Sequence, residues 1–216
     1  MKKFLLTLAT MFLLSTTTYA AQNEIILSTV GAKSNELSVT NALQQRKSSR
    51  NFIDKDLTPA QLSKILWAAN GINRENGKRT VPVALGVYSV EVYAVTKEGI
   101  YLYDVENHKL QLIAEGDFRS TTTTGQSFVS KAALNLVYVE TPTAWESSRR
   151  MPPRDSQLAF ANITVGAMVQ SVALAAETEG LGNCVRGSIN RDEFTKIAKL
   201  SADKNILLAQ SVGYIK

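Results

Sequence analysis

The sequence contains a single cysteine, Cys184, and a single histidine, His108. One cysteine cannot form an intramolecular disulfide or build a zinc site made of several thiolates. A hydrolase with a serine–histidine–aspartate triad would have to use His108, which lies in a stretch that we expect to form a hairpin turn. A secreted hydrolase is therefore a poor explanation of this chain.

Long apolar runs are also scarce. The run at residues 4–14 is too short to span a bilayer comfortably, and no second run of about 20 apolar residues follows. Lys2 and Lys3 precede this run and a small-residue cleavage site follows it at residues 18–20, as in a secretory signal peptide. We expect residues 1–20 to be removed, no stable membrane span, and export to the periplasm. An uncleaved membrane anchor is the alternative.

The chain carries no strong excess of either charge, since 24 lysines and arginines face 19 acidic residues among 216. A formal net charge of +5 is mildly basic and gives no argument for nucleic-acid binding. The length left after cleavage is enough for one good hydrophobic core. We therefore expect a single domain over residues 21–216.

A compact basic motif is what the sequence does contain. Arg46-Lys47-Ser48-Ser49-Arg50 places three cations and two hydroxyl groups within five residues. Guanidinium groups and serine hydroxyls suit the oxygens of a phosphate. Most charge runs are simply solvated surface, so an exposed basic turn is the competing interpretation. The motif favours a site that holds a phosphorylated cofactor by its tail.

Outside residues 117–131, the spacing of apolar residues predicts four helices. The clearest begins at Thr58-Pro59-Ala60-Gln61, a capping box with proline at the first helical position, and ends at Asn70-Gly71. Another, over residues 41–47, leads into the basic motif. A long helix over residues 156–178 is apolar nearly all round, so it is buried in the core or in a subunit interface. A second capping signal at Asn190 begins the last helix.

Alternating apolar residues predict strands separated by turns. A three-stranded antiparallel meander is expected over residues 87–95, 100–103 and 110–113, with His108 in its second turn. Further strands are expected at residues 133–140 and 206–214, with a short one at residues 25–27. Residues 117–131 are interpreted as a loop and a helix, and residues 183–188 as a connection. Residues 143–155 are interpreted as a flexible basic loop, either an exposed linker or a lid beside a substrate.

The order of these pieces resembles the nitroreductase family of flavoproteins. More narrowly, it resembles the branch that includes the azoline-oxidising dehydrogenases of peptide maturation. The resemblance covers about residues 40–216. It rests on the segments at residues 46–52, 62–71, 79–82, 99–103, 180–182, 185–187 and 212–214.

The resemblance implies an α+β fold with a central, mostly antiparallel sheet flanked by helices, built as an intertwined homodimer that binds FMN at its interface. By the same resemblance, Arg46, Lys47, Ser48 and Arg50 would hold the phosphate and the ring edge, with Lys216 completing the phosphate site. Pro82, Val83 and Ala84 would lie along the flavin. The backbone of Val185, Arg186 and Gly187 would approach the ring from the other side.

The function that follows is an exported FMN-dependent oxidoreductase without a catalytic acid–base side chain, because the flavin carries the chemistry. It would take a hydride from a reduced donor such as NAD(P)H and pass electrons to a small organic acceptor. A non-catalytic module that keeps the fold and holds a flavin or another planar ligand is the alternative. The two differ in whether the bound ligand can be reduced and reoxidised.

Overall fold

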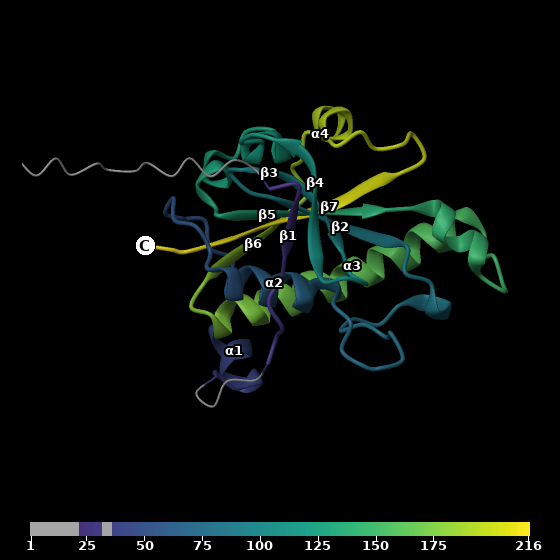
Figure 1. The fold of residues 1–216 in the computed structure, drawn as a ribbon, viewed down its shortest axis with the longest axis horizontal. Helices are drawn as coiled ribbons and strands as arrows, with labels where there is room; N and C mark the ends of the chain where they lie inside the picture. Colours follow the sequence, from purple (N-terminus) through teal and green to yellow (C-terminus); the bar gives the residue numbers. More distant parts are fainter. Residues whose placement is uncertain (1–21, 32–35) are drawn as a thin grey trace, which may run out of the picture.

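The computed structural model describes residues 22–31 and 36–216, so the expected signal peptide lies outside the described residues. Its centre is a seven-stranded sheet (Figure 1). The strands are β1 (Glu24–Ile26), β2 (Val90–Val95), β3 (Gly99–Asp104), β4 (Lys109–Glu115), β5 (Leu134–Glu140), β6 (Gly182–Arg186) and β7 (Asn205–Gly213). Their order is β1-β4-β3-β2-β5-β7-β6, and every neighbouring pair is antiparallel. The expected antiparallel sheet and its β2–β3–β4 meander are confirmed.

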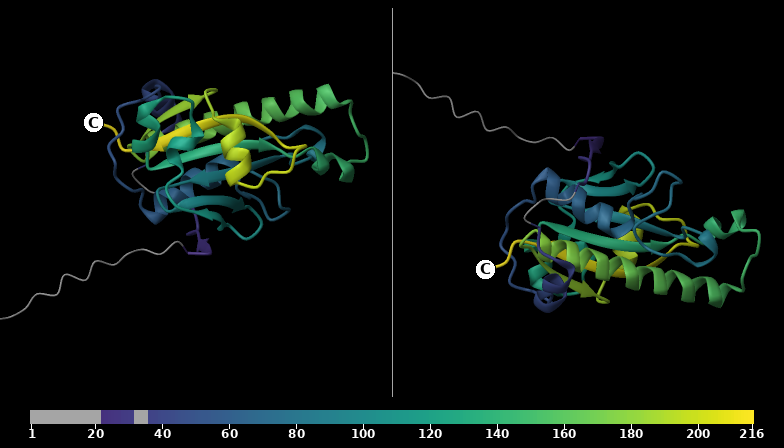
Figure 2. Two further views of the ribbon diagram at one scale, coloured as in Figure 1. Left: turned by 90° about the horizontal axis from the view of Figure 1, so that it is seen from above. Right: turned by 90° about the horizontal axis from the view of Figure 1, so that it is seen from below.

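Helices cover both faces of this sheet. The α-helices are α1 (Val39–Gln45), α2 (Pro59–Asn70), α3 (Arg154–Thr178) and α4 (Arg191–Ile197). Figures 1 and 2 show α2 and α3 on one side of the sheet and α4 on the other. The α+β class with flanking helices is therefore confirmed.

Strand β2 shows why the sheet is buried on both faces. Val90, Val92 and Ala94 point into the larger core with α2 and α3, whereas Tyr93 and Val95 point into the smaller core with α4. Successive side chains of a strand point to opposite faces of the sheet. A strand with apolar side chains on both faces therefore needs a covering layer on each side. The three-layer arrangement follows from this pattern.

Helix α2 begins as the sequence predicts. The Gln61 N–H donates to the Thr58 hydroxyl at 3.2 Å, and the Thr58 N–H donates back to the Gln61 side chain at 3.0 Å. The helix ends at Asn70, with Gly71 as its C-cap. Trp67 is half-buried on its flank and donates its indole N–H to the Ile72 carbonyl at 2.9 Å.

Three segments differ from the expectation. Residues 183–188, interpreted as a connection, contain most of strand β6. Residues 117–131 form two short 3₁₀ helices, η2 (Arg119–Thr122) and η3 (Ser127–Lys131), in place of a loop and a helix.

The predicted flexible loop at residues 143–155 also differs. It holds the 3₁₀ helix η4 (Pro142–Ser147) and the first residues of α3. Trp145 in η4 is only 1 % exposed and packs 6.0 Å from the Phe160 ring. Burial of this large aromatic side chain ties the segment to the core at Trp145, so the segment is not an exposed linker throughout.

Helix α3 is buried along one stripe rather than all round. Ala161, Val165 and Met168 are at most 1 % exposed, while Ile163 on the other side is 68 % exposed. Gly166 also lies on the exposed side, with open space where a Cβ would stand. Among the helices of residues 22–31 and 36–216, α3 is the one whose length and composition would allow it to cross a membrane, criteria that a core helix also meets.

Candidate cofactor-binding site

Backbone hydrogen bonds fix the basic segment, residues 46–51, between strand β6 and the C-terminal tail. The Ser49 N–H donates to the Asn183 carbonyl at 2.7 Å, and the Lys216 N–H donates to the Asn51 carbonyl at 3.0 Å. These bonds bring the last residue of the chain across a segment that lies 165 positions earlier. The segment is a positioned element and not a free turn.

A glycine allows this close approach. At Gly182, the first residue of β6, an added Cβ would lie 2.3 Å from Ile215 Cγ2 and 2.8 Å from Ser49 Cβ. Real Cβ atoms do not approach other atoms so closely, so a larger residue would push the basic segment and the tail away from β6.

The basic segment and the tail enclose a hollow of about 320 Å³. Its lining residues are Lys47, Ser48, Ser49, Arg50, Asn51, Ile215 and Lys216. Four of the predicted cofactor-binding residues, Lys47, Ser48, Arg50 and Lys216, are thus brought together. Arg46 follows α1 directly, is half-buried, and does not line this hollow.

The cations at this place are not neutralised by the protein. Within the described part of the chain, Arg46, Lys47, Arg50 and Lys216 form no ion pair. Neighbouring cations without carboxylate partners repel one another, and an anion with more than one negative charge relieves that repulsion. The residues therefore fit the phosphate group of a cofactor such as FMN.

Strand β6 continues from the basic segment as a free edge. It is the last strand in the sheet order, and the bridge between Ser48 and Asn183 pairs its outer side only near its start. Val185, two residues beyond Asn183, lies about 7 Å further along the strand and is 39 % exposed. Gly187 is also exposed, so this backbone edge is open to a planar ligand beside the basic segment.

The side chain of Arg186 points the opposite way, into the protein. It is 3 % exposed and holds five hydrogen bonds of 2.8–3.3 Å. The acceptors are the Ser211 hydroxyl, the Thr122 carbonyl and hydroxyl, the Ser188 carbonyl and the Asn135 side-chain oxygen. All of these acceptors are neutral, and burial lowers the pKa of the Arg186 guanidinium to about 10. It remains a cation at neutral pH, held under the outward-facing β6 backbone.

Pro82, Val83 and Ala84 lie at the other end of the sheet. They precede β2, whose first residue, Val90, pairs with the last residue of β5, whereas the basic segment lies beside the residues that pair with the start of β5. The seven residues of β5 span about 20 Å. Figure 1 shows these two parts of the chain on opposite sides of the fold. One chain does not bring these three residues to the basic segment.

The chain belongs to a known family. The Nitroreductase family matches residues 43–214. A nitroreductase-family protein of Methanocaldococcus jannaschii, MJ1384, is 29 % identical over 174 residues, which cover 76 % of this chain and 86 % of that protein. A crystal structure of a nitroreductase-family protein from Ralstonia eutropha is 33 % identical, with a TM-score of 0.81 over 90 % of each chain. This chain is an oxidoreductase of the nitroreductase family.

More distant structures share the fold alone. A chain of the E. coli microcin synthetase McbBCD complex is 21 % identical, with a TM-score of 0.67 over 88 % of this chain and 79 % of that one. A Desulfovibrio desulfuricans member of the family was solved in complex with FMN; it is 19 % identical, with a TM-score of 0.60 over 83 % and 87 % of the two chains. The resemblance to this family is confirmed, and the microcin synthetase chain shares the fold.

Proposed function

We propose that this protein is an exported FMN-dependent oxidoreductase that takes a hydride from a reduced donor such as NAD(P)H and passes electrons to a small organic acceptor. The observation that carries the proposal is the set of unneutralised cations, Lys47, Arg50 and Lys216, around a hollow beside the free edge of β6. Bound FMN would supply the acceptance and return of the hydride, as flavins do.

The chain's own groups would bind and orient the cofactor. Arg50, Lys47 and Lys216 would neutralise the phosphate, and Ser48 would donate a hydrogen bond to it. Arg46, at the C-cap of α1, would reach the phosphate or the ring edge. The N–H groups of Val185 and Gly187 would face the flavin from the open side of β6, with the buried guanidinium of Arg186 behind them.

A second copy of the chain would complete the site. Pro82, Val83 and Ala84 lie at the far end of the sheet from the basic segment, so they can line the same flavin only from a partner. The exposed stripe of α3 supports a dimer, because Ile163 is 68 % exposed and Gly166 permits close approach of another surface. We propose a homodimer with one composite site per chain.

Export belongs to the same proposal and rests on the N-terminal sequence alone. Residues 1–20 have the charged, apolar and small-residue regions of a secretory signal peptide. Removal of these residues in the periplasm would leave the domain intact, because the first strand begins at Glu24. N-terminal sequencing of the protein recovered from the periplasm tests this part, and an intact Met1 would contradict it.

The experiment that tests the function is reduction and reoxidation of the bound flavin. We expect the protein loaded with FMN to lose its visible flavin absorption when NADH or NADPH is added without oxygen, and to recover it when a quinone or a nitroaromatic compound is added. If dithionite reduces the flavin but neither nicotinamide does, the donor assignment is wrong. If the bound FMN is never reoxidised by an organic acceptor, the non-catalytic binding module becomes the better explanation.

A further inference from the structure

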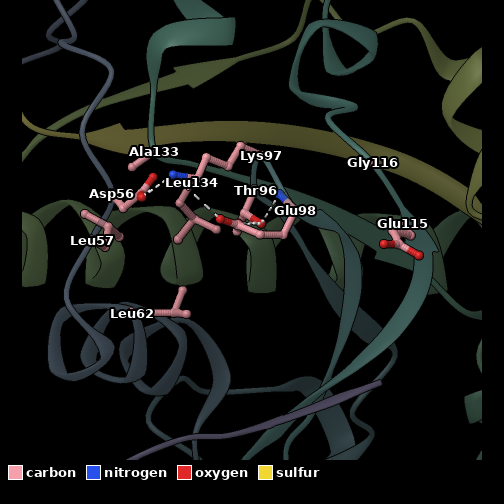
Figure 3. Close-up of a pocket in the computed structure, with 10 residues that line it drawn as sticks. All are labelled: Asp56, Leu57, Leu62, Thr96, Lys97, Glu98, Glu115, Gly116, Ala133 and Leu134. Carbon is pink, nitrogen blue, oxygen red and sulfur yellow. Dashed lines mark hydrogen bonds and ion pairs between the residues drawn. The ribbon is translucent and has the colours of Figure 1, made fainter. Parts of the chain in front are cut away.

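A larger hollow of about 720 Å³ lies between α2, the segment before it and the turn that joins β2 to β3 (Figure 3). Its lining residues are Asp56, Leu57, Leu62, Thr96, Lys97, Glu98, Glu115, Gly116, Ala133 and Leu134. A neighbouring hollow of about 310 Å³ shares four of these residues and reaches β1. We call the two together the α2 cleft. It shares no lining residue with the hollow at the basic segment, and its size is typical of a small-molecule site.

The α2 cleft has an apolar floor. Leu57, Leu62 and Leu134 line the larger hollow, and Ile25 and Leu27 line the smaller one. Figure 3 shows the side chain of Leu62 extending from α2 toward the space below the β2–β3 turn. Such a floor favours the apolar body of an organic ligand over a free ion.

The rim of the cleft is acidic, although the chain as a whole carries +5. Three carboxylates, Asp56, Glu98 and Glu115, line the larger hollow together with one ammonium group, that of Lys97. Lys97 is paired with Asp56 and lies 3.8 Å from Glu98. Glu115 is exposed and has no ion pair among the described residues. The net negative rim selects for a positively charged group.

The hydroxyl group of a buried tyrosine faces the same space. Tyr101 is 1 % exposed, lines the smaller hollow, and its hydroxyl makes no hydrogen bond within residues 22–31 and 36–216. Burial, and then the charges of Glu98 and Glu115, raise the pKa of Tyr101, which keeps the phenol protonated and able to donate.

Other buried tyrosines of the sheet do have partners. Tyr93 bonds to Glu91, Tyr103 to His108 and Tyr138 to Gln210, at 2.8–3.0 Å. The Tyr101 hydroxyl has no such partner among the described residues and opens onto the smaller hollow, so it is free to donate to a molecule bound there.

We propose that the α2 cleft binds a small organic cation. This ligand would bind apart from the proposed flavin site and take no part in the flavin chemistry. Its apolar body would lie on the leucine floor and its protonated amine at Glu115 and Glu98. A hydrogen-bond acceptor on the body would receive the Tyr101 hydroxyl. An anion of the same shape would meet the carboxylate rim and be rejected.

The probe series for the test keeps one body and changes only the charge. It consists of 4-(4-methoxyphenyl)butylamine, the corresponding alcohol and the corresponding carboxylic acid, each titrated into the exported protein loaded with FMN. Isothermal titration calorimetry should show the amine binding at least about tenfold more tightly than the acid, with the alcohol between them. Equal binding of all three, or no binding of the amine, would overturn the proposal.

Two substitutions separate the ligand's contacts from folding. Tyr101→Phe should lower the affinity for the amine about fivefold, because it removes one hydrogen bond. It should leave the melting temperature of the unliganded protein unchanged, because the hydroxyl has no partner in the chain. Glu115→Gln should weaken the amine by about two- to fivefold, the range of an exposed ion pair.

Glu75→Gln is the matched control, since Glu75 is an exposed carboxylate beyond the other end of α2, about 18 Å away along the helix. It should change nothing. A Tyr101→Phe variant that binds the amine as well as the parent would contradict the proposal. So would a Glu115→Gln substitution that shifts the dimer equilibrium in light scattering instead of amine affinity, because a second copy would then occupy the cleft.

Discussion

At the scale of single residues, Arg186 is a buried cation without a carboxylate partner among the described residues. Removal of a charge from water is expensive unless the charge is hydrogen-bonded, and here five bonds to neutral oxygens replace the lost solvation. Only a planar guanidinium can reach Ser211, Thr122 and Asn135 at once. The network also joins β6 to β5, β7 and η2, so it holds the strand that carries the proposed flavin edge.

Replacement of Arg186 with lysine tests this role. We expect Arg186→Lys to lower the free energy of unfolding by about 2–3 kcal/mol, because one ammonium group leaves buried acceptors unpaired. Urea denaturation measures the loss. Arg191→Lys is the control, since Arg191 is exposed and its bonds to backbone carbonyls are 3.1–3.5 Å. Equal losses in the two variants would contradict the account.

His108 has a structural role that its place in the sequence did not reveal. The turn is confirmed, and the residue adopts φ 45° there. Its Nε2 donates to the Ser28 carbonyl at 3.1 Å, which leaves Nδ1 to accept the Tyr103 hydroxyl at 2.8 Å. The neutral ring thus ties the N-terminal arm to the β3–β4 hairpin. Burial lowers the pKa of His108, in favour of this neutral form.

Because the chain has a single histidine, replacing His108 removes every histidine titration from the pH dependence of stability. Since the folded pKa of His108 lies below its unfolded value of about 6.5, its contribution is fully present above that pH and is lost as pH falls through the folded pKa. We expect the melting temperature of the parent to fall more between pH 7 and pH 5 than that of His108→Asn, by an amount worth less than about 1 kcal/mol. Asparagine tolerates the left-handed backbone. If the melting temperatures of the two proteins change equally between pH 7 and pH 5, this role of His108 is refuted.

At the scale of elements, local sequence patterns correctly predicted the helices and strands that depend on local interactions. The capping box of α2 and the alternation of β2 appear in the structure as expected. Strand β6 was missed because Gly182–Arg186 is short and four of its five residues are buried, so it shows no alternation. Its pairing with β7 is a long-range contact. The burial of Trp145 likewise depends on Phe160, which no local pattern reveals.

The cap of α2 also affects the cofactor end of the molecule. Gln61 accepts the Thr58 N–H and the Tyr214 hydroxyl, so the same side chain anchors the helix start and the C-terminal tail. We expect Thr58→Ala to cost about 1 kcal/mol of stability, and Thr58→Ser, which keeps the cap, only a few tenths. Urea midpoints at constant m-value measure both. A serine variant as unstable as the alanine variant would show that capping is not the cause.

At the scale of the whole molecule, the sequence predicted the fold class, and the structure brings part of the proposed site together. The basic segment, Lys216 and the edge of β6 meet within one chain because the tail crosses residues 46–51. The separation of Pro82–Ala84 from them follows from sheet register, which a pattern of residues does not contain. The family resemblance supplied both groups of residues, and the proposed homodimer would join them.

The central claim is that the unneutralised cations hold the phosphate of FMN, and the most direct measurement compares FMN with riboflavin, which lacks that phosphate. Fluorescence titration should give a dissociation constant for FMN more than about tenfold below that for riboflavin, since charge-assisted bonds to the phosphate contribute most of the difference. Arg50→Ala and Arg46→Ala should each reduce the difference between the two dissociation constants. Each substitution should weaken the binding of FMN and leave the binding of riboflavin unchanged. Equal affinities of the parent protein for the two flavins would contradict the account.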